Sequence, residues 1–582
     1  MLRIRRAIVP AIFASTLFAC GAVPTPDAGT DAGSELCVAF PERIDANYTV
    51  EKGCWLVLKT PTIAAAVTVT VKPGARLLFS AGTRLAFSAD QVLSAVGTQS
   101  EPILFTGAGP ARGFWKGLLF DGTANASTLE WVTVEYGGDT AADADAANVK
   151  LTGDSRGVRV GFSHVTLRES EGFGLWLAGS AVLPTFTANT LTANTLGPLS
   201  LDAETVGRLD AASTFTGNGK DELEVRSYRL LTSATWVNPG VPYHLTADFA
   251  SIGAAKLTLS AGVKLIFPPE GALTISGDGA ALITEGTAAD PVVLTGETPA
   301  RGAWEGVVFD NSNNTDNQLR YARVEYAGNT SSDAKAAGVV LRADSHGVQV
   351  KLDHLVVRES QGYGLRLAGS ALIPGVHSSS FTANALGAVL ADTEAVEQLG
   401  PDSLFTGNDV DRVFLEGQWV SGTVTWRDLG VPYVFTGITI APKAVWTLEP
   451  GVVLEMRPQS RIDVGGGDGV GFHAAGTSAK PITITGTEKT NGSWDGIDFD
   501  TTLNAANVLD NCVVEYGGGG ARFGWHAMIN SHSDSHGVRV AVTNSTIRHS
   551  ATWGIYFNGA QTGAVTGNTY LDNAQGDYFH EP

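Results

Sequence analysis

The chain repeats itself at an interval of about 190 residues. The stretches GFWKGLLFD, GAWEGVVFD and GSWDGIDFD recur in order, and the turns DSRGVRV, DSHGVQV and DSHGVRV follow them. The same interval separates three tryptophans, three glutamates and three arginines: Trp115, Trp304 and Trp494; Glu135, Glu325 and Glu515; Arg168, Arg358 and Arg548. Such uniform spacing indicates that whole structural units were duplicated, which restricts the fold to a repeat architecture.

Each unit consists of short stretches in which apolar and polar residues alternate. In WVTVEYGG, for example, we assign Val132, Val134 and Tyr136 to the inward phase. Gly, Asn, Asp and Ser separate these stretches, and no amphipathic stretch is long enough for a crossover helix. This pattern favours a solenoid of short strands over a meander or sandwich.

The G-x-W-x-G stretches, the φ-E-Y-G/A-G stretches and the F-T-G-N and F-T-A-N turns resemble those of right-handed parallel β-helix surface proteins of the pectate-lyase-like superfamily. The resemblance covers roughly residues 45 to 582. It implies an all-β fold, a right-handed parallel β-helix solenoid built from three internal copies. With about 22 residues per coil we expect roughly two dozen coils and a rod of over about 100 Å. In that architecture asparagines at turns adopt the left-handed conformation and stack between coils: Asn194, Asn218, Asn384, Asn408 and Asn568.

The N-terminus is typical of an export signal. Residues 1–19 combine three arginines with a short apolar stretch, and Leu17-Phe18-Ala19-Cys20-Gly21 resembles the lipobox of bacterial lipoproteins. We therefore predict a signal peptide over 1–19, lipidation of Cys20 and a flexible tether over 20–36. An ordinary signal peptide followed by a chance cysteine is the alternative.

The remaining boundaries follow from the repeats. We expect an N-terminal cap over 37–55, β-helix copy 1 over 56–236, copy 2 over 237–426 and copy 3 over 427–582. Solenoid ends need covering, and the final segment YLDNAQGDYFHEP is expected to form the C-terminal cap.

Export also bears on the cysteines. Cys37 and Cys54 flank the start of the repeats and are predicted to form a disulfide, since exported proteins retain such bonds. Val132 and Ala322 stand where Cys512 stands, which favours a small buried thiol there.

The formal net charge of −20 is spread along the chain. It disfavours nucleic acid and anionic polysaccharide as partners but leaves cation binding open.

The recurring glutamates and arginines are placed in outward phases. They form either salt-bridged pairs between neighbouring coils or three equivalent ligand sites. We favour structural pairs (Glu135, Arg168, Glu325, Arg358, Glu515 and Arg548), because a catalytic residue is rarely needed three times in one chain.

Other polar residues also recur and are interpreted structurally. Asp154, Asp344 and Asp534 suit Asx turns, with a metal role as the alternative, and Asp121, Asp310 and Asp500 are placed in turns. His526, His532, His536 and His549 lie close together in the third copy. They suggest a zinc or copper site, but separate surface histidines are the interpretation we favour.

Tryptophans are the candidates for stacking on sugars. The recurring Trp115, Trp304 and Trp494 are expected to cover strand edges or turns. The copy-specific Trp131, Trp176, Trp525 and Trp553 are the better candidates for ligand contact.

The superfamily's lyases and hydrolases use clustered carboxylates, with Ca²⁺ and an arginine in the lyases. We find no carboxylate cluster unique to one copy, so no catalytic residue is carried over, and we expect no cofactor, with Ca²⁺ as the alternative. The favoured function is a non-enzymatic, lipid-anchored cell-envelope protein that binds or presents a glycan or envelope protein, in the outer membrane or at the cell surface. The alternative is a polysaccharide lyase or glycosidase that uses the third copy.

Overall fold

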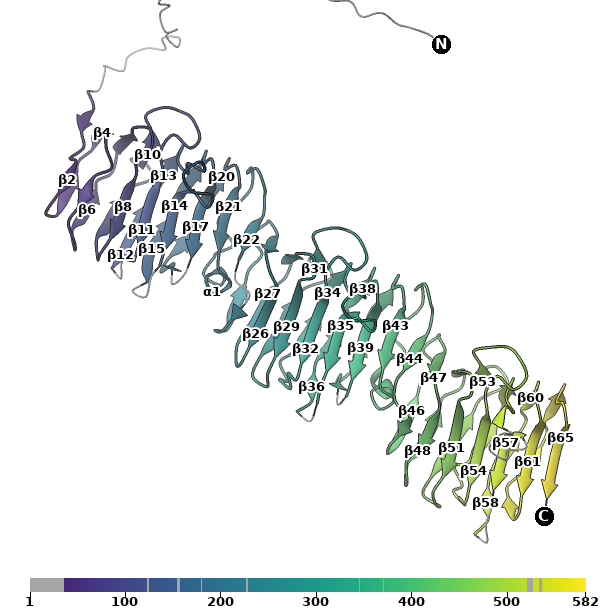
Figure 1. The fold of residues 1–582 in the computed structure, drawn as a ribbon. Helices are drawn as coiled ribbons and strands as arrows, with labels where there is room; N and C mark the ends of the chain where they lie inside the picture. The colour runs from purple at the N-terminus through teal and green to yellow at the C-terminus, as the bar shows by residue number, and fades with distance from the viewer. Residues whose placement is uncertain are drawn as a thin grey trace, which may run out of the picture.

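The structure is a computed structural model that describes residues 36–581, apart from 123–124, 154–156, 179–180, 227–228, 345, 370, 521–526 and 533–535. Short parallel strands stack coil upon coil into an elongated parallel β-helix, so the all-β prediction is confirmed (Figure 1). The signal peptide, Cys20, and all of the tether but Leu36 lie outside the described residues. No helix among the described residues is long and apolar enough to cross a membrane.

Four long sheets carry the described part of the chain. The first contains β1 (Val38–Ala39), β4 (Gly53–Val57), β7 (Ala75–Phe79), β10 (Ile103–Gly107), β13 (Val132–Glu135), β16 (Thr166–Arg168) and β20 (Thr190–Thr192). The second contains β8 (Leu85–Ser88), β11 (Leu118–Asp121), β14 (Ala147–Thr152), β17 (Phe173–Ala178), β21 (Gly197–Leu201), β22 (Leu223–Val225), β25 (Tyr243–Leu245), β28 (Lys264–Phe267), β31 (Val292–Gly296), β34 (Ala322–Glu325), β38 (Val356–Arg358) and β42 (Ser380–Thr382). The third contains β23 (Arg229–Leu230), β26 (Phe249–Ile252), β29 (Ala272–Ser276), β32 (Gly306–Asp310), β35 (Ala337–Arg342), β39 (Tyr363–Ala368), β43 (Gly387–Ala391), β44 (Val413–Leu415), β47 (Tyr433–Phe435), β50 (Val453–Met456), β53 (Ile482–Gly486), β56 (Cys512–Glu515), β60 (Thr546–Arg548) and β64 (Thr569–Leu571). The fourth contains β45 (Trp419–Val420), β48 (Ile438–Ile440), β51 (Arg461–Gly465), β54 (Gly496–Asp500), β57 (Ala527–His532), β61 (Trp553–Asn558) and β65 (Gly576–Glu581).

Further sheets complete the coils. One joins β3 (Tyr48–Val50), β6 (Thr68–Val71), β9 (Val92–Val96), β12 (Ala126–Glu130), β15 (Val158–Ser163), β18 (Ala181–Val182) and β19 (Phe186–Thr187). The second joins β24 (Ala234–Trp236), β27 (Lys256–Ser260), β30 (Ala281–Glu285), β33 (Gln318–Arg320), β37 (Lys351–Asp353) and β41 (Val376–His377), and the third joins β46 (Thr423–Trp426), β49 (Val445–Leu448), β52 (Gly471–Ala475), β55 (Val508–Asp510), β59 (Ala541–Thr543) and β63 (Val565–Thr566). The two-stranded sheets are β2 (Arg43–Ile44) with β5 (Thr62–Ile63), β36 (Val348–Gln349) with β40 (Ala371–Leu372), and β58 (Val538–Arg539) with β62 (Gln561–Thr562); α1 (Ala203–Val206) and the 3-10 helix η1 (Val396–Gln398) are the short helices.

Alternation along each strand builds the core. In β7 the inward Ala75, Leu77 and Phe79 are fully buried, and one continuous hydrophobic cluster runs from Phe40 to Phe557. Burying each large apolar side chain contributes roughly 1.5–3 kcal/mol, so the rod is held by a core that extends along its whole described length.

The predicted inward phase of Tyr136 is wrong. This residue has a φ of 62° and is only half-buried, and Tyr326 and Tyr516 repeat that conformation with φ of 61° and 63°. The left-handed residue ends the strand at the preceding glutamate, which stops the alternation. A bulky residue in this region needs support from its surroundings.

The stacked asparagines are present, but they are not left-handed. The Nδ2 of Asn194 donates to Oδ1 of Asn218 over 3.0 Å, and Asn384 and Asn408 repeat this bond over 3.0 Å. The positive φ lies instead on the preceding Ala193 and Ala383. The alanines therefore make the turn, while the asparagines satisfy the backbone of the next coil.

Many coils are longer than the expected 22 residues, although strand partners are 22 residues apart at Trp55 and Leu77 and 20 apart at Leu223 and Tyr243. Hydrogen-bonded partners on neighbouring coils are 29 residues apart at Thr106 and Glu135, 33 at Glu135 and Arg168, and 24 at Asn194 and Asn218. Loops that follow β10 and β13 account for the longer steps, so the rod has fewer coils than the sequence predicted.

The sheets change repeats along the rod. In every repeat the strands equivalent to β10 and those equivalent to β11 lie in different sheets. The second sheet begins with β8 to β21, which include β11 of the first repeat. It continues into β28 to β42, which include β31, the counterpart of β10 in the second repeat. The third sheet makes the same step from β29–β43 to β50–β64. Loops beside β10, β31 and β53 nevertheless emerge on the same side of the rod in Figure 1, because strands within a sheet twist relative to one another.

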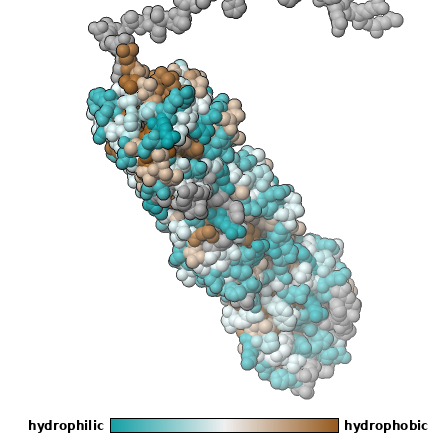
Figure 2. All heavy atoms as spheres, turned by 60° about the vertical axis from the view of Figure 1, so that its left-hand side comes forward, coloured by the Kyte–Doolittle hydropathy of each residue, from teal (hydrophilic) through white to brown (hydrophobic). Residues whose placement is uncertain are grey.

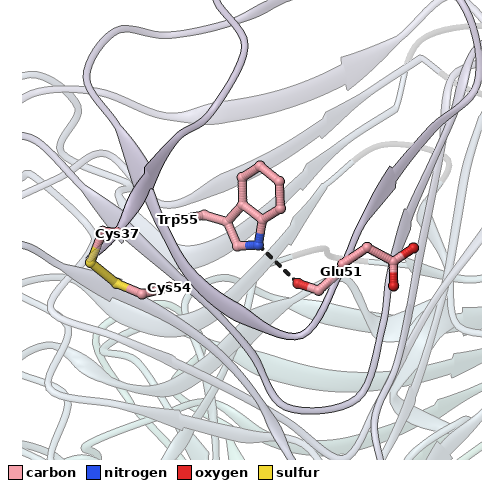
Figure 3. The surroundings of a disulfide bond; sticks show 4 residues. All are labelled: Cys37, Glu51, Cys54 and Trp55. Carbon is pink, nitrogen blue, oxygen red and sulfur yellow. Dashed lines mark hydrogen bonds between the residues drawn. A yellow bond between two sulfur atoms is a disulfide. The ribbon is translucent and has the colours of Figure 1, made fainter. Parts of the chain in front are cut away.

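The two ends differ. Near the N-terminus Cys37 and Cys54 form the predicted disulfide, with 4.4 Å between their Cα atoms (Figure 3). At the other end the segment expected to form a cap provides β64 and β65, which extend two sheets. Leu571, Tyr578 and Phe579 there remain 40–46% exposed.

Candidate functional site

The recurring glutamates and arginines lie opposite each other on neighbouring strands. Arg168 Nε donates to Glu135 over 2.7 Å, Arg358 Nε to Glu325 over 2.8 Å, and Arg548 Nε to Glu515 over 2.7 Å. The glutamates keep the outward register that was expected but are not exposed, since each is only 6–8% exposed. The pairs thus resemble one another in geometry in all three repeats.

The recurring tryptophans lie beneath these pairs and are fully buried. Trp115 Nε1 donates to the carbonyl of Glu135 over 2.9 Å, and Trp304 and Trp494 make the same bond to Glu325 and Glu515 over 2.8 and 2.9 Å. Each indole therefore satisfies the last carbonyl before the left-handed tyrosine. This bond places the three tryptophans in the core and not at a ligand-binding surface.

In the first and second repeats an arginine in the loop after β10 and after β31, respectively, attaches that loop to later coils. Arg112 donates to Glu169 over 2.9 Å and to Thr195 over 3.1 Å. Arg301 donates to Glu359 over 2.9 Å and reaches both carboxylate oxygens of Asp409. We assign Arg301 a structural role, because its side chain contacts carboxylates of later coils.

The third repeat differs from the other two on the outward side of the fourth sheet. We call the outward side of β51, β54, β57, β61 and β65 the third-repeat face. Strand register aligns two rows of side chains across it. The central row contains Asp463, Asp498, Asn530, Tyr556 and Phe579, and the flanking row contains Gly465, Asp500, His532, Asn558 and Glu581.

Asp498 is the centre of this face. Asn530 Nδ2 donates to its Oδ1 over 2.9 Å, and His532 Nε2 lies 3.4 Å from the same oxygen. The pKa of Asp498 is raised to about 6, chiefly by burial. The nearby carboxylates of Asp463 and Asp500 also raise it, whereas His532 and the hydrogen bond from Asn530 lower it. Asp498 can therefore hold or release a proton near neutral pH.

The surroundings extend this site in both directions. On one side Arg461 Nε donates to Asp463 over 2.9 Å, and both residues line a hollow of about 270 Å³ with Asp495. On the other side the rings of Tyr556 and Phe579 stack with centroids 5.3 Å apart. Acids, an arginine and exposed rings thus follow one another along the rod.

The same positions in the other repeats carry different residues. The central row reads Ala86, Leu119, Lys150, Trp176 and Ser200 in the first repeat, and Thr274, Val308, Val340, Arg366 and Leu390 in the second. Asp463 and Asp498 therefore form a pair of carboxylates that the other two repeats lack, which was not predicted from the sequence. The sequence hid it because Asp463 and Asp498 come from separate coils, and only strand register brings them together.

The histidines of the third repeat are dispersed. His532 faces Asp498, His536 faces Asp468 at 3.2 Å, and His549 stacks on Tyr516 with centroids 4.9 Å apart. His526 lies outside the described residues. Within the described part of the chain, no three His, Cys, Asp or Glu side chains form a group that can hold a metal ion.

The four copy-specific tryptophans also lie in different surroundings. Trp176 is only 7% exposed and lies under the Arg226 guanidinium, 4.1 Å from the ring centroid, so its predicted ligand contact is wrong. Trp131 stacks on His164, and Trp553 is half-buried with its ring 5.4 Å from that of Phe579. Trp525 lies outside the described residues.

The recurring aspartates have structural contacts. Asp344 makes the predicted Asx turn, because its Oδ1 accepts the His346 N–H over 3.0 Å; Asp154 and Asp534 lie outside the described residues. Asp121, Asp310 and Asp500 end strands β11, β32 and β54 and do not lie in turns as expected. Cys512 is buried as predicted, and burial raises the pKa of its thiol to about 12.

A separate cleft of about 1080 Å³ is formed by the second repeat, with Arg427 of the third repeat also in its lining. Its lining includes Ile373, His377, Glu394, Glu397 and Asp402. Unlike the third-repeat face, it contains no buried polar atom that lacks a partner among the described residues. We therefore take the third-repeat face as the candidate site.

Comparisons with known proteins support the class of fold. Residues 230–349 match the family model described as a pectate-lyase like beta helix domain. No curated protein and no solved structure matches the chain. The protein is a parallel β-helix, and the match lies almost entirely in the second repeat and not on the third-repeat face.

Proposed function

We propose that this protein is an exported, lipid-anchored, non-enzymatic protein of the cell envelope that binds a polysaccharide along its third-repeat face. The observation that carries the proposal is the central row, in which carboxylate, amide and aromatic side chains follow one another in strand register. Adjacent strands are about 4.8 Å apart, so a row of this kind offers regularly spaced polar and stacking groups to an extended chain.

The N-terminal end supports anchoring. The apolar segment before Cys20 and the Pro-, Ala- and Gly-rich sequence after it suit a lipid anchor and a tether, with the outer membrane or the cell surface as the site. Hydrophobic residues gather at the N-terminal end of the face that Figure 2 shows, and Leu36, Val38 and Leu58 are more than half exposed. An anchored rod would present the third repeat away from the membrane.

A second candidate function is cleavage of the bound polysaccharide. Asp498 favours it, because an acid with a pKa near 6 beside Asp463 and His532 suits general acid catalysis. Arg461 and Asp463 would then position the substrate.

The experiment is a binding and depolymerisation screen of the protein without its lipid, against neutral, amino-substituted and uronic polysaccharides, with and without Ca²⁺. Retention on a polysaccharide without new reducing or unsaturated ends supports binding. New ends that disappear in Asp498→Asn would establish the enzyme instead. No retention on any polysaccharide would refute both functions and direct the search to envelope proteins.

A further inference from the structure

The central row of the third-repeat face carries carboxylates at 463 and 498, where the other repeats have Ala86 and Leu119, and Thr274 and Val308. Asp500 in the flanking row has counterparts in Asp121 and Asp310. Asp463, Asp498 and Asp500 lie on adjacent positions of two strands, and Arg461 is paired with Asp463. Glu581 lies further along the flanking row. The local field therefore attracts cations and repels uronic acids.

The first two repeats balance their charges on these rows. Lys150 lies within hydrogen-bonding distance of Asp143, Arg366 donates to Asp333 over 2.7 Å, and Arg342 donates to Asp310 over 3.1 Å. At the corresponding positions the third repeat has Asn530, Tyr556 and His532. It has lost the cations but has gained carboxylates at 463 and 498.

A buried amide points to the same kind of ligand. Asn530 is fully buried in the central row, and its Nδ2 donates to Asp498 and lies 2.6 Å from His532 Nε2. Its Oδ1 has no hydrogen-bond donor among the described residues. An acceptor left in this state costs free energy, and because the oxygen itself is buried a ligand N–H would recover that cost only if the Asn530 side chain turned toward the surface.

We propose that the third-repeat face binds a glycan whose sugars carry free amino groups, such as a polymer of glucosamine. The ammonium groups would pair with Asp463, Asp498 and Asp500, and Tyr556 and Phe579 would stack on sugar rings. This inference rests on the proposed function and narrows it to one class of ligand.

Protonation provides a readout besides affinity. Asp498 is surrounded by Asp463 on β51, Asp500 on β54 and His532 on β57, and its carboxyl is held partly protonated near pH 6. An ammonium placed beside it favours the ionised form, so binding releases protons. Titration calorimetry at pH 5.5 in two buffers of different ionisation enthalpy measures that release.

The test uses the full mature protein and three oligosaccharides of equal length: glucosamine, N-acetylglucosamine and galacturonate oligomers. At pH 5.5 and low salt we expect the glucosamine oligomer to bind at least about ten-fold more tightly than either other oligomer. Asp463→Asn combined with Asp500→Asn should weaken that binding at least about ten-fold. The matched control, Asp121→Asn with Asp310→Asn, removes two charges in the first two repeats and should leave binding unchanged.

The outcomes separate the inference from the proposed function. Preference for galacturonate or for the acetylated oligomer, still sensitive to the third-repeat variants, overturns the amino-sugar ligand and leaves glycan binding intact. Loss of affinity that is equal in the control variant also overturns it, because the attraction would then be general. Absence of binding to all three oligomers and to the broader polysaccharide screen overturns both. If the double variant fails to fold, Asp500→Asn alone, at an exposed strand end, carries the same comparison.

Discussion

Glu135 and Asp498 are both poorly exposed carboxylates, with side chains 9% and 13% exposed, and their partners distinguish them. Glu135 accepts hydrogen bonds from Thr106 over 2.9 Å and from Arg168 over 2.7 Å, so its ionised form is well compensated. Asp498 accepts one from an amide and faces a histidine at 3.4 Å. The first arrangement recurs in each repeat as a packing solution, and the second occurs on the third-repeat face.

The arginines should matter chiefly because they cover a buried charge. Arg358→Met removes the nearer of the two arginines beside Glu325 and leaves Arg323, whose Nε lies 3.6 Å from that carboxylate. Since Glu325 is 8% exposed, we expect a loss of on the order of 1–2 kcal/mol in the free energy of unfolding. The expected loss of stability is small because the Arg358 side chain is half exposed and water screens the ion pair. Chemical denaturation measures the loss, and Glu325→Gln with Arg358→Met should recover most of it. A double variant no more stable than Arg358→Met would contradict the pairing.

Asp498 should destabilise the fold at neutral pH. Its folded pKa of about 6 exceeds the reference value of 3.8, so the folded state binds more protons and stability falls as pH rises between these values. Asp498→Asn should therefore increase the free energy of unfolding at pH 7.5 by up to about 3 kcal/mol, which raises the melting temperature. At pH 3.5 the substitution should have no effect. Thermal melts across this range provide the measurement, with Asp121→Asn as the control. A gain that persists at pH 3.5 would point to packing instead of charge.

At the scale of elements, loops are fastened by single side chains that reach over several coils. Arg301 joins the loop after β31 to Glu359 and Asp409, and Arg112 joins the loop after β10 to Glu169 and Thr195. In the third repeat Lys489 contacts Thr485 and the Gly486 carbonyl of its own loop. The three loops are thus similar in position but not in attachment.

Removing Arg301 should free its loop without loosening the sheets. In Arg301→Ala we expect hydrogen exchange to accelerate several-fold across residues 297–305, with the β31 and β34 amides unchanged, because the core contacts stay in place. The loop over 487–495 should exchange at the faster rate already in the wild type. Equal protection of the two wild-type loops would argue against this role for Arg301.

The disulfide should act on the first coils alone. Cys37 and Cys54 are 17 residues apart, and a bridge of this span stabilises by roughly 3 kcal/mol. In Cys37→Ser with Cys54→Ser we expect faster exchange in β1 and β4 and no change beyond β10, since coils contact only their neighbours. Exchange mass spectrometry of both proteins checks this, and acceleration throughout the rod would contradict it.

Sequence reasoning predicted most elements because the relevant information is local. Alternation and the 190-residue interval predict the β-helix, and the cysteine positions predict the disulfide. The left-handed tyrosines were missed because Tyr136 follows a regular alternation until the backbone turns. Asp463 and Asp498 were missed because loop lengths, which periodicity does not predict, determine which coils bring them side by side.

At the scale of the molecule, two of the long sheets continue from one repeat into the next. The second sheet runs from β8 to β42, and the third runs from β23 to β64. No sheet boundary coincides with a boundary between sequence repeats in these two sheets. The repeats therefore share hydrogen bonds and core and are expected to fold as one array.

That continuity makes the length of the array adjustable in whole repeats. Deleting residues 237–426 joins Trp236 to the residue that follows its counterpart Trp426, so strand register is kept. We expect a folded protein with unchanged circular dichroism per residue and a maximum dimension shorter by about a third in small-angle scattering. Deleting 237–416 instead shifts the register and should produce an aggregated or partly unfolded chain. Equal behaviour of the two deletions would show that the repeats are not equivalent.

The direction of the backbone hydrogen bonds has a mechanical consequence. Strands lie across the rod, so the bonds between coils point along it, and a pull between the two ends loads them in tension one coil at a time. A tether at the N-terminus would transmit such a pull first to the coil that Cys37 and Cys54 lock together. The rod would therefore resist bending, but under tension it would unwind from its C-terminal end, where no disulfide in the described chain closes the last described coil.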